Sequence, residues 1–512
     1  MRPSVYIIGA GPGAPDLVTL RGLRALQLAH VVIYDRRVHP RLLDLAPASA
    51  ERIDVGSPAP QAAEQDAINF LLAEKAREGH VVARLKWGDP FLFDHGGAEA
   101  LFLHEQGIAF EVVPGVPALV ASPAFAGVPL TYPGSGDTVT FIRGFEDNGR
   151  KAPEVDWASL ARLDGTLACF AGPELLRHVV GALLTHGRPP QEAAAFVAHG
   201  TLSAQQTAAA PLGELLARVD EMGLSAPGIL VVGSVTGLRD HLRWFDNRPL
   251  FGRRVLVTRS REQAPELVEL LELNGAETVE APVLRIAAPE DTAPLERAVS
   301  DIRSFDWIVF TSTNAVAGVV GPLTARARDL RALAGPRVCA VGPGTASRLH
   351  RYGITADTQP TDHRASGVVA AMTDASPLGG ARVLLPVSDG AADPLADELR
   401  RAGADVTEIT VYRTITEEGD IHLGLYRQML DRRIDAVTFT SGNTVRAFVE
   451  IYGAEQSPDL LSGTVVATIG PAAADAAARA GITVHVATEG ATIAALVDGL
   501  IRHFRPSPGQ PN

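Results

Sequence analysis

An internal duplication in the second half of the chain constrains its fold more than any other sequence feature. The segment RVLVTRS at 254–260 aligns with RVLLPVS at 382–388, an offset of 128 residues. At the same offset NGAETVEAPVL aligns with AGADVTEITVY, and CAVGPGTA aligns with ATIGPAAA. A fourth pair, FTSTNAV and FTSGNTV, is displaced by 129 residues, which one inserted loop residue explains. Because this unit is far longer than a solenoid repeat, the duplication predicts two related lobes that fill 253–505.

Each repeated block has the pattern of a strand followed by a helix. An apolar, β-branched run leads into a turn of Gly, Pro, Ser or Thr and then an amphipathic segment, as in VLVTRSREQAPELVELLELNG. This alternation predicts parallel sheets flanked by helices. Ligands of such sheets bind at the carboxyl ends of the strands, where helix N-termini present free N–H groups to anions. The Thr-Ser pairs of FTSTNAV and FTSGNTV are predicted to lie at those ends.

The chain length predicts several domains. At roughly 100–200 residues per domain, 512 residues correspond to about three or four. The polar segment FDNRPLFGRR marks the main boundary, and the Pro and Gly residues of VPLTYPGSGD indicate a second one near 130. The predicted bounds are 1–245, with subdomains of about 1–130 and 131–245, a linker at 246–252, the duplicated domain at 253–505 and a disordered tail at 506–512.

Composition excludes several classes of function. Asp and Glu number 59 against 46 Lys and Arg, the formal net charge is −13, and no stretch has the basic block of a nucleic-acid groove. Cys169 and Cys339 lie in apolar runs and are expected in the core, and the histidines lack metal-ligand spacing. The start MRPSVYIIGAG has no signal-peptide pattern, and no run approaches the ~18 apolar residues of a membrane span. We therefore expect a cytoplasmic protein with no metal, nucleic-acid or membrane partner.

The first half begins with a pattern that imitates a dinucleotide site. VYIIGAGPGAPD runs from a strand into a glycine turn, and the next strand, HVVIYD, ends in Asp35. Such glycines let a phosphate approach the backbone, and such an acid binds a ribose hydroxyl. Pro12 and Pro15, however, remove N–H donors that a nucleotide-binding turn needs. A nicotinamide-dependent oxidoreductase is therefore kept only as a rival interpretation.

Further motifs in the first half resemble a known family. VVARLKWGDPFLFDHGG is followed by IAFEVVPGVPALVASPAFAGVPLT. With the glycine turn, their order from Val5 to about Leu130 resembles the tetrapyrrole methylases, above all S-adenosylmethionine uroporphyrinogen-III C-methyltransferase. A weaker resemblance continues to Phe245. It implies two α/β subdomains with the methyl donor in the cleft between them, and conversion of uroporphyrinogen III to precorrin-2.

The resemblance also implies the site residues of this half. Asp35 matches the family's proposed proton acceptor. Lys86, one of three lysines in the chain, has a functional role as one alternative, but we expect it to extend its ammonium group to solvent from a strand end. The residues implied to contact S-adenosylmethionine are Pro12, Trp87, Gly88, Asp89, Leu92, Pro117, Ala118, Ala171 and Gly200.

Several positions depart from the family pattern. Ser57 stands where the family has a lysine after Val-Gly, and Trp87 replaces the first glycine of GGDP. In GRGGEE the arginine becomes His95 and the first glutamate becomes Ala98, and Ala171 replaces a methionine. His95 could still bind a substrate carboxylate, without the bidentate geometry of a guanidinium. Two interpretations stay open: a working methyltransferase, or a retained fold that serves as scaffold or as the surface of a homodimer.

The second half, 253–505, resembles uroporphyrinogen-III synthase. RVLVTR, FDWIVFTSTNAV, VCAVGPGTA, VLLPVSDG, VTEITVYRT, DAVTFTSGNTV and VATIGPAAA occur in the family's order. The resemblance implies two Rossmann-like lobes joined by crossing segments, one at 253–286 plus 415–505 and the other at 290–411. The implied reaction closes linear hydroxymethylbilane with inversion of its last pyrrole. This half contains no lysine and only one cysteine, so covalent catalysis by an amine or thiolate has no obvious residue, and no cofactor is expected.

Catalysis in the second half should therefore depend on orienting a substrate with eight carboxylates. Tyr412 matches the family's tyrosine, and its phenol could protonate the departing hydroxyl, although strand-end tyrosines are often structural. The residues expected to bind carboxylates are Arg259, Ser312, Thr313, Arg413, Ser441 and Thr444. For both arginines an ordinary surface role remains an alternative.

The two halves together predict a uroporphyrinogen-III synthase fused to a uroporphyrinogen-III C-methyltransferase domain, because one product is the other's substrate. A monofunctional synthase with an inactive methylase-like domain is the first rival. A non-enzymatic, two-lobed anion receptor is the second, since clefts of this type serve both uses.

Overall fold

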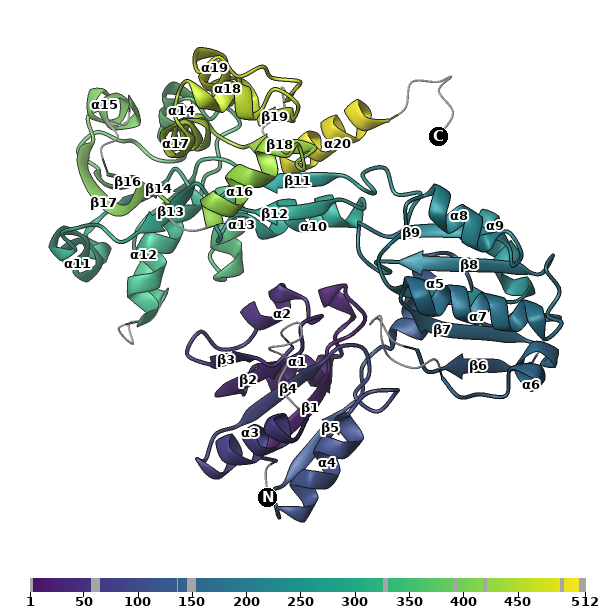
Figure 1. Ribbon diagram of the computed structural model, residues 1–512. Coiled ribbons are helices and arrows are strands. Elements are labelled where there is room, and N and C mark those ends of the chain that lie inside the picture. The colour runs from purple at the N-terminus through teal and green to yellow at the C-terminus, as the bar shows by residue number, and fades with distance from the viewer. Residues whose placement is uncertain are drawn as a thin grey trace. The chain divides into compact units, whose positions relative to one another are not determined.

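The computed structural model describes residues 3–56, 65–135, 137–144, 153–325, 330–389, 394–417, 421–488 and 492–505. Within these ranges lie four five-stranded sheets covered by helices (Figure 1). The chain forms two compact units, of which the N-terminal unit holds most residues up to Arg254 and the C-terminal unit most residues after it. The expected α/β class is confirmed. Ser57 and the predicted tail at 506–512 lie outside the described residues.

The first sheet of the N-terminal unit is parallel, in the order β3-β2-β4-β1-β5. Its strands are β1 (Val5–Gly9), β2 (Val31–Tyr34), β3 (Glu51–Asp54), β4 (Val82–Lys86) and β5 (Phe110–Val113). One face packs against α1 (Leu20–Leu26) and α2 (Pro40–Asp44), and the other packs against α3 (Gln65–Arg77) and α4 (Gly96–Glu105). Because β4 has neighbours on both sides and helices on both faces, it is buried along its whole length.

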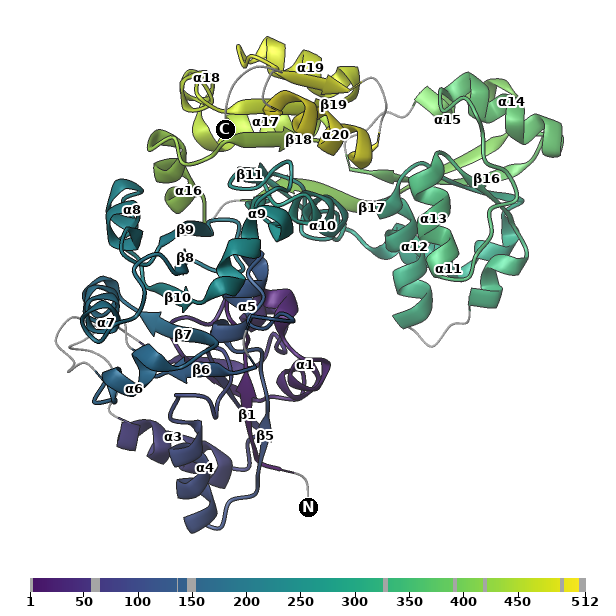
Figure 2. The same ribbon diagram turned by 90° about the vertical axis from the view of Figure 1, so that its right-hand side faces the viewer.

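The second sheet of this unit is mixed, in the order β6-β7-β10-β8-β9. Its strands are β6 (Val139–Ile142), β7 (Thr166–Ala171), β8 (Ala193–Ala198), β9 (Gln206–Pro211) and β10 (Gly228–Val232). Figure 2 shows the strands side by side with α7 (Pro173–Thr185) beside them. On the other face lies α5 (Ala118–Phe125), which the sequence-based bounds place in the first subdomain but which packs here. The remaining helices of the unit are α6 (Trp157–Arg162), α8 (Leu215–Glu221) and α9 (Arg239–Leu242).

The C-terminal unit contains the other two sheets. One has the order β12-β11-β18-β19-β20, and the second has the order β13-β17-β16-β14-β15. The strands are β11 (Arg254–Val257), β12 (Glu277–Glu280), β13 (Leu284–Ala287), β14 (Trp307–Phe310), β15 (Arg337–Ala340), β16 (Arg382–Ser388), β17 (Asp405–Thr416), β18 (Ala436–Phe439), β19 (Val465–Ile469) and β20 (Val486–Thr488). The helices are α10 (Pro265–Leu273), α11 (Ala293–Ser300), α12 (Thr313–Ala325), α13 (Pro343–Arg351), α14 (Ala365–Ala375), α15 (Pro394–Arg401), α16 (Ile421–Leu430), α17 (Gly442–Tyr452), α18 (Gln456–Leu460), α19 (Gly470–Arg479) and α20 (Ile493–Phe504).

Each of these two sheets combines both copies of the duplicated sequence. The order β12-β11-β18-β19 in one sheet corresponds, block for block, to β17-β16-β14-β15 in the other. The first copy supplies β11 and β12 to one sheet but β14 and β15 to the other, and the second copy does the reverse. Antiparallel pairing of β13 with the end of β17, from Leu284 opposite Thr416 to Ala287 opposite Arg413, forms a pair of crossing segments. The two lobes are thus the product of an exchange between the copies.

Short 3-10 helices complete the described secondary structure. They are η1 (Pro15–Leu17), η2 (Ser234–Leu238), η3 (Ile302–Ser304) and η4 (Leu330–Ala334). Both cysteines are buried, as expected, and burial raises the pKa of Cys169 and of Cys339 to about 12. No described helix has the length and apolar character that crossing a bilayer requires.

Candidate active sites

Three turns of the N-terminal unit meet at the carboxyl ends of β1, β4 and β5. A Cβ added to Gly115 would lie 2.1 Å from the carbonyl oxygen of Gly88, and one added to Gly9 would lie 2.5 Å from Gly115. The backbones therefore touch at a distance that only glycine permits. Asp89 fixes the contact, because its carboxylate accepts hydrogen bonds from the backbone N–H groups of Phe91, at 2.8 Å, and Gly115, at 3.0 Å.

Two neighbouring cavities open beside these turns, with volumes of about 350 Å³ and about 300 Å³. Trp87, Ala118 and Phe170 line both. Asp35, His95 and all but one of the residues expected to contact the methyl donor line one or both cavities; those donor residues are Pro12, Trp87, Gly88, Asp89, Leu92, Pro117, Ala118 and Gly200. Ala171 is not among the lining residues and is fully buried at the end of β7. The sequence-based set thus converges on one region, with Ala171 outside it.

The Trp87 side chain lies where the two cavities adjoin. Its indole N–H donates to the carbonyl of Pro12 at 2.8 Å, and its ring lies 5.3 Å from that of Phe170. The Arg37 guanidinium carbon is 4.8 Å from the centroid of each ring, a cation–π distance. Phe170 and Arg37 had no signal as site residues in the sequence, because their approach to Trp87 depends on the packing of the two sheets.

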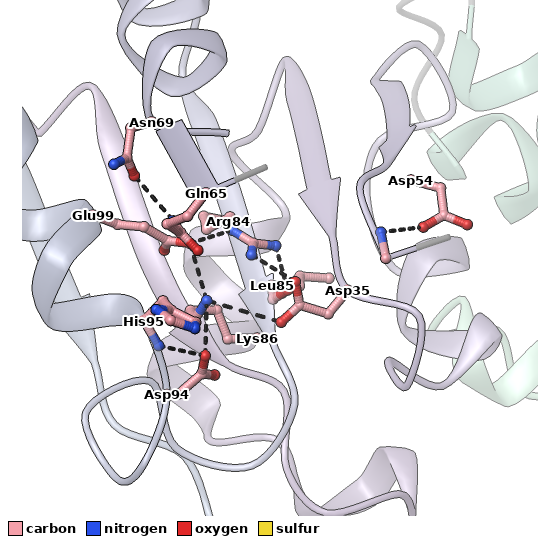
Figure 3. Close-up of polar contacts among 11 residues, drawn as sticks. Asp35, Asp54, Gln65, Asn69, Arg84, Leu85, Lys86, Asp94, His95 and Glu99 are labelled. Carbon is pink, nitrogen blue, oxygen red and sulfur yellow. Dashed lines mark hydrogen bonds and ion pairs between the residues drawn. The ribbon is translucent and has the colours of Figure 1, made fainter. Parts of the chain in front are cut away.

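Charged side chains gather beside Asp35, and three of them, Arg84, Lys86 and Glu99, are buried (Figure 3). Lys86 is only 1% exposed, so the expectation that it reaches solvent is wrong. Its Nζ instead lies 3.0 Å from Glu99 Oε1, 3.1 Å from Asp94 Oδ1 and 3.9 Å from Asp35 Oδ2. Arg84, also 1% exposed, donates to Asp35 Oδ1 at 2.6 Å and to Glu99 Oε1 at 3.1 Å. We call Asp35, Arg84, Lys86, Asp94 and Glu99 the charge cluster.

Electrostatics within the charge cluster favour the ionised forms of two members. Burial acts to lower the pKa of Arg84, but the carboxylates of Asp35 and Glu99 outweigh burial and raise it. Burial likewise acts to raise the pKa of Glu99, and the charges of Arg84 and Lys86 outweigh it and lower that pKa. For Asp94 burial prevails and raises the pKa. The sequence predicted a role for Asp35 and contained Glu99 in the matched motif, but it gave no signal that these five side chains meet.

The cavities fit the methyl donor that the sequence implies. Gly88 has φ +72°, and a Cβ there would project between the donor-contact turns, 3.7 Å from Pro117 and 3.8 Å from Ala118. At Gly200 a Cβ would lie 2.2 Å from Ser122 Oγ, so this wall also requires glycine. Backbone and apolar groups thus form one part of the lining, which suits the adenosine part of the methyl donor, and Arg36 and Arg37 also line the smaller cavity. Pro12, Trp87, Ala118 and Gly200 are the residues that would hold the adenosine.

In the C-terminal unit the structure brings Ser312, Thr313 and Tyr412 together. Tyr412 Oη on β17 lies 3.3 Å from Ser312 Oγ, which also accepts the backbone N–H of Ala315 at 3.0 Å. Thr313 begins α12 immediately after Ser312. The tyrosine hydroxyl therefore lies at the N-terminal end of a helix, where free N–H groups favour anions.

Arg413 does not join this group. Successive residues of a strand point to opposite faces, so Tyr412 and Arg413 diverge. The Arg413 guanidinium binds Glu290 at 2.5 Å and the carbonyl of Ala288 at 3.1 Å. Its described contacts are those of a structural ion pair.

Arg259 has a different environment at the end of β11. Its Nε is buried without a hydrogen-bond partner among the described residues, as is the hydroxyl of the adjacent Ser260. Its Nη2 lies 3.4 Å from the side-chain oxygen of Gln263. Burial lowers the pKa of Arg259. A buried N–H group without a partner is costly, so Arg259 is suited to receive an acceptor from a ligand.

Ser441 and Thr444 cap α17. Ser441 Oγ accepts the N–H of Thr444 at 3.3 Å, and Thr444 Oγ1 accepts the N–H of Ser441 at 3.3 Å and donates to its carbonyl at 2.7 Å. This reciprocal arrangement is a capping box. Both hydroxyls already serve the helix terminus, and Thr444 is buried. Among the described residues no group of three or more His, Cys, Asp or Glu side chains could hold a metal ion.

Two family models match different parts of the chain. Residues 4–216 match the family model of Tetrapyrrole (Corrin/Porphyrin) Methylases, and residues 265–498 match that of Uroporphyrinogen-III synthase HemD. A Ruminiclostridium josui protein named "Porphyrin biosynthesis protein HemD" is 32% identical over 504 residues, which cover 97% of both chains. This chain belongs to the HemD family of porphyrin biosynthesis proteins. It is a fusion of a tetrapyrrole methylase domain and a uroporphyrinogen-III synthase domain, as the sequence predicted.

Relatives of the methylase domain alone are also similar. The "S-adenosyl-L-methionine-dependent uroporphyrinogen III methyltransferase" of Methanosarcina barkeri is 41% identical over 239 residues, which are 46% of this chain and 94% of that protein. A crystal structure of uroporphyrin-III-C-methyltransferase from Thermus thermophilus is 36% identical and has a TM-score of 0.40, covering 47% of this chain and 99% of that one. Both cavities lie in the methylase domain, and Tyr412 and Ser312 lie in the synthase domain.

Proposed function

We propose that the chain catalyses two consecutive reactions. The synthase domain closes hydroxymethylbilane to uroporphyrinogen III, and the methylase domain transfers methyl groups from S-adenosylmethionine to that product. The convergence of Asp35 and the expected donor residues on two adjoining cavities carries the proposal for the methylase domain. The name of the M. barkeri relative supports the choice of donor and substrate.

In the methylase domain Asp35 is the proposed proton acceptor. S-adenosylmethionine, when bound, supplies an electrophilic methyl group. A ring carbon of the substrate would form the new bond to this methyl group as the donor's sulfur–methyl bond breaks. That carbon carries no hydrogen, so the proton would leave from another position of the macrocycle, where a carboxylate at the cavity wall can accept it. The Asp35 side chain is 26% exposed and lines the larger cavity, so it can reach a bound substrate.

Four cationic or ionisable groups of the larger cavity suit the substrate's carboxylates. Arg36, Arg37, Arg143 and His95 line this cavity. Guanidinium groups bind carboxylates by charge-assisted hydrogen bonds. These arginines therefore offer an explanation of how the domain can retain activity with His95 in place of the family's arginine.

In the synthase domain Tyr412 is the proposed general acid. Loss of the substrate's hydroxyl leaves a conjugated cation, and the phenol of Tyr412 can protonate the departing oxygen. Ser312 orients the phenol, and the N-terminus of α12 with Arg259 binds substrate carboxylates. Ring closure then needs orientation alone, so we propose that this domain uses no cofactor.

Two further features belong to the proposal. We propose a cytoplasmic enzyme, in keeping with the absence of a described membrane-spanning helix, and a homodimer formed through the methylase domain. Size-exclusion chromatography with light scattering, comparing the full chain at several concentrations, tests the dimer. A constant mass of one chain would contradict it.

Anaerobic incubation of the purified chain with hydroxymethylbilane, with and without S-adenosylmethionine, tests the main proposal. Products are separated by chromatography and identified by mass. We expect type III uroporphyrinogen without the donor and a gain of two methyl groups with it. The type III product in both reactions, without methylation, would show a monofunctional synthase. If neither product forms, both activities are excluded and a binding protein is favoured.

A further inference from the structure

Arg84 is anchored so firmly that its guanidinium has one orientation. It lies in the central strand β4 and is 1% exposed. Its Nε binds Glu99 Oε1 at 3.1 Å, and its Nη1 binds the backbone carbonyl of Leu85 at 3.2 Å. The remaining terminal nitrogen, Nη2, binds Asp35 Oδ1 at 2.6 Å. Each nitrogen of the planar group thus has an acceptor, and the group presents one fixed donor to Asp35 (Figure 3).

Strand alternation explains why the anchor forms. Arg84 and Lys86 are two residues apart in β4, so their side chains leave the sheet on the same face. Glu99, from α4 on that face, is fully buried and accepts from both cations through Oε1. Its Oε2 is buried without a hydrogen-bond partner among the described residues. All the described hydrogen bonds of the Glu99 side chain are therefore accepted by Oε1, and their donors are Arg84, Lys86 and Gln65.

Stability does not explain these charges, because buried ion pairs rarely stabilise a protein more than apolar residues of similar size. Their geometry does have a use at the cavity. Asp35 is the member of the charge cluster assigned to accept a proton, and Arg84 holds its Oδ1. The other oxygen, Oδ2, has only the more distant Lys86 nitrogen at 3.9 Å among the cluster's ion pairs.

We propose that Arg84 is a positioning residue for methyl transfer. It fixes Asp35 through Oδ1, so that Oδ2 receives the proton that the substrate loses after methylation, and Glu99 acts one step further away by orienting Arg84. The proposal rests on the role given to Asp35 above. In this role Arg84 is a cationic partner for Asp35, although the family's lysine at position 57 is replaced by serine.

A double-mutant cycle on the full chain tests this role. Arg84→Lys keeps the charge but loses the planar set of donors. We expect kcat for methylation of uroporphyrinogen III to fall by about 100-fold, the scale of a misplacement of roughly 1 Å, with the KM values for donor and substrate within about 2-fold. In an Asp35→Asn background the same change should cost no further activity, because the group that Arg84 positions is already disabled.

Arg188→Lys is the matched control. Arg188 is also buried, at 4% exposure, and binds Glu192 and the carbonyls of Leu163 and Gly165, away from the cavity-lining residues. We expect its kcat to stay within about 2-fold of wild type, since its contacts are structural. Calorimetric binding of S-adenosylhomocysteine by each variant reports whether the donor site is folded.

The outcomes separate this proposal from the proposed function. An inactive wild-type methylase domain would overturn both. An active wild type with unchanged kcat in Arg84→Lys, or an equal loss in the Asp35→Asn background, would overturn the positioning role alone. If Arg84→Lys does not fold, Glu99→Gln replaces it. That variant should lower kcat by about 10-fold, and this loss should also vanish in the Asp35→Asn background; a loss that persists there would overturn the proposal.

Discussion

The methylase and synthase domains both place their candidate groups at the carboxyl ends of parallel strands, but with different chemistry. In the methylase domain β4 carries two buried cations, Arg84 and Lys86, paired with carboxylates. In the synthase domain the corresponding region presents hydroxyls, those of Ser312 and Tyr412, and the half contains no lysine. A base must be held at one point beside the substrate, whereas ring closure needs a surface that folds the substrate on itself. In the proposed mechanisms the buried charges of the methylase domain serve the first task, and the hydroxyls of the synthase domain, with Arg259, serve the second.

The close contacts of the two domains differ in the same sense. The methylase turns meet backbone to backbone at Gly9, Gly88 and Gly115, which makes a rigid floor. At the synthase strand ends the helix caps fill that role, as Ser441 and Thr444 show at α17.

The largest expected effect is that of Asp35→Asn. We expect methylation to slow by about 1,000-fold, within the range for loss of a general base. Synthase turnover should not change, because the substitution lies in the other domain. Rates are measured separately with uroporphyrinogen III plus donor and with hydroxymethylbilane alone. Asp220→Asn, which removes an exposed ion pair with Arg177, is the control, and equal methylation rates in both variants would refute the assignment.

Tyr412→Phe should give the reverse pattern. We expect formation of uroporphyrinogen III to fall by about 100-fold, at the lower end of acid catalysis, with methylation of supplied uroporphyrinogen III unchanged. Enzymatic product is separated from spontaneously closed type I isomer by chromatography. Tyr352→Phe, at a tyrosine that contacts Arg348 in the same lobe, is the control. Turnover of Tyr412→Phe at the wild-type rate would leave Tyr412 with a structural role.

The two synthase arginines provide a smaller, paired test. Arg259→Gln should raise KM for hydroxymethylbilane by about 10-fold, the value of one charge-assisted hydrogen bond. Arg413→Gln should change KM by less than about 2-fold, since Glu290 and Ala288 already occupy its guanidinium. Steady-state kinetics of both variants decide the matter. Equal effects would show that the buried Nε of Arg259 does not meet the substrate.

The smallest expected effect concerns pH and stability. Burial raises the folded-state pKa of Asp94, so wild-type stability should fall as pH rises from the unfolded-state value near 4 through the folded-state pKa. Asp94→Asn removes that fall. The free energy of unfolding of the variant minus that of wild type should therefore be larger at pH 7 than at pH 4, so the variant gains in relative stability as pH rises. Glu99, with its lowered pKa, contributes in the opposite sense, by stability that is lost as pH falls.

Urea denaturation followed by tryptophan fluorescence measures this difference. Three of the four tryptophans, Trp87, Trp157 and Trp244, lie in the first half of the chain, so the signal reports mainly that unit. If the free energies of unfolding of wild type and Asp94→Asn differ by the same amount at pH 4 and pH 7, the prediction is wrong. Asp220→Asn again serves as a control, expected to show no pH-dependent difference.

Much of the fold could be predicted from the sequence because local patterns specify the strands, the helices and the turns between them. The duplicated blocks predicted two related lobes, and the sheet orders β12-β11-β18-β19 and β17-β16-β14-β15 show the same sequence of blocks. The family resemblance implied that Gly88, Pro117 and Gly200 share one site, and all three line the adjoining cavities. Apolar runs around Cys169 and Cys339 placed both in the core.

What the sequence determined by itself is therefore the family, the α/β class and the turns that form the methylase cavities. Only the tertiary structure decided that Lys86 is buried, that Arg84 binds Asp35 across 49 positions of sequence, and that Tyr412 faces Ser312 while Arg413 turns to Glu290. Periodicity and motifs report which face of an element is apolar and where it ends. Contacts between side chains depend on the register of strands that are distant in sequence and on which helix covers them. Local sequence patterns do not specify that register.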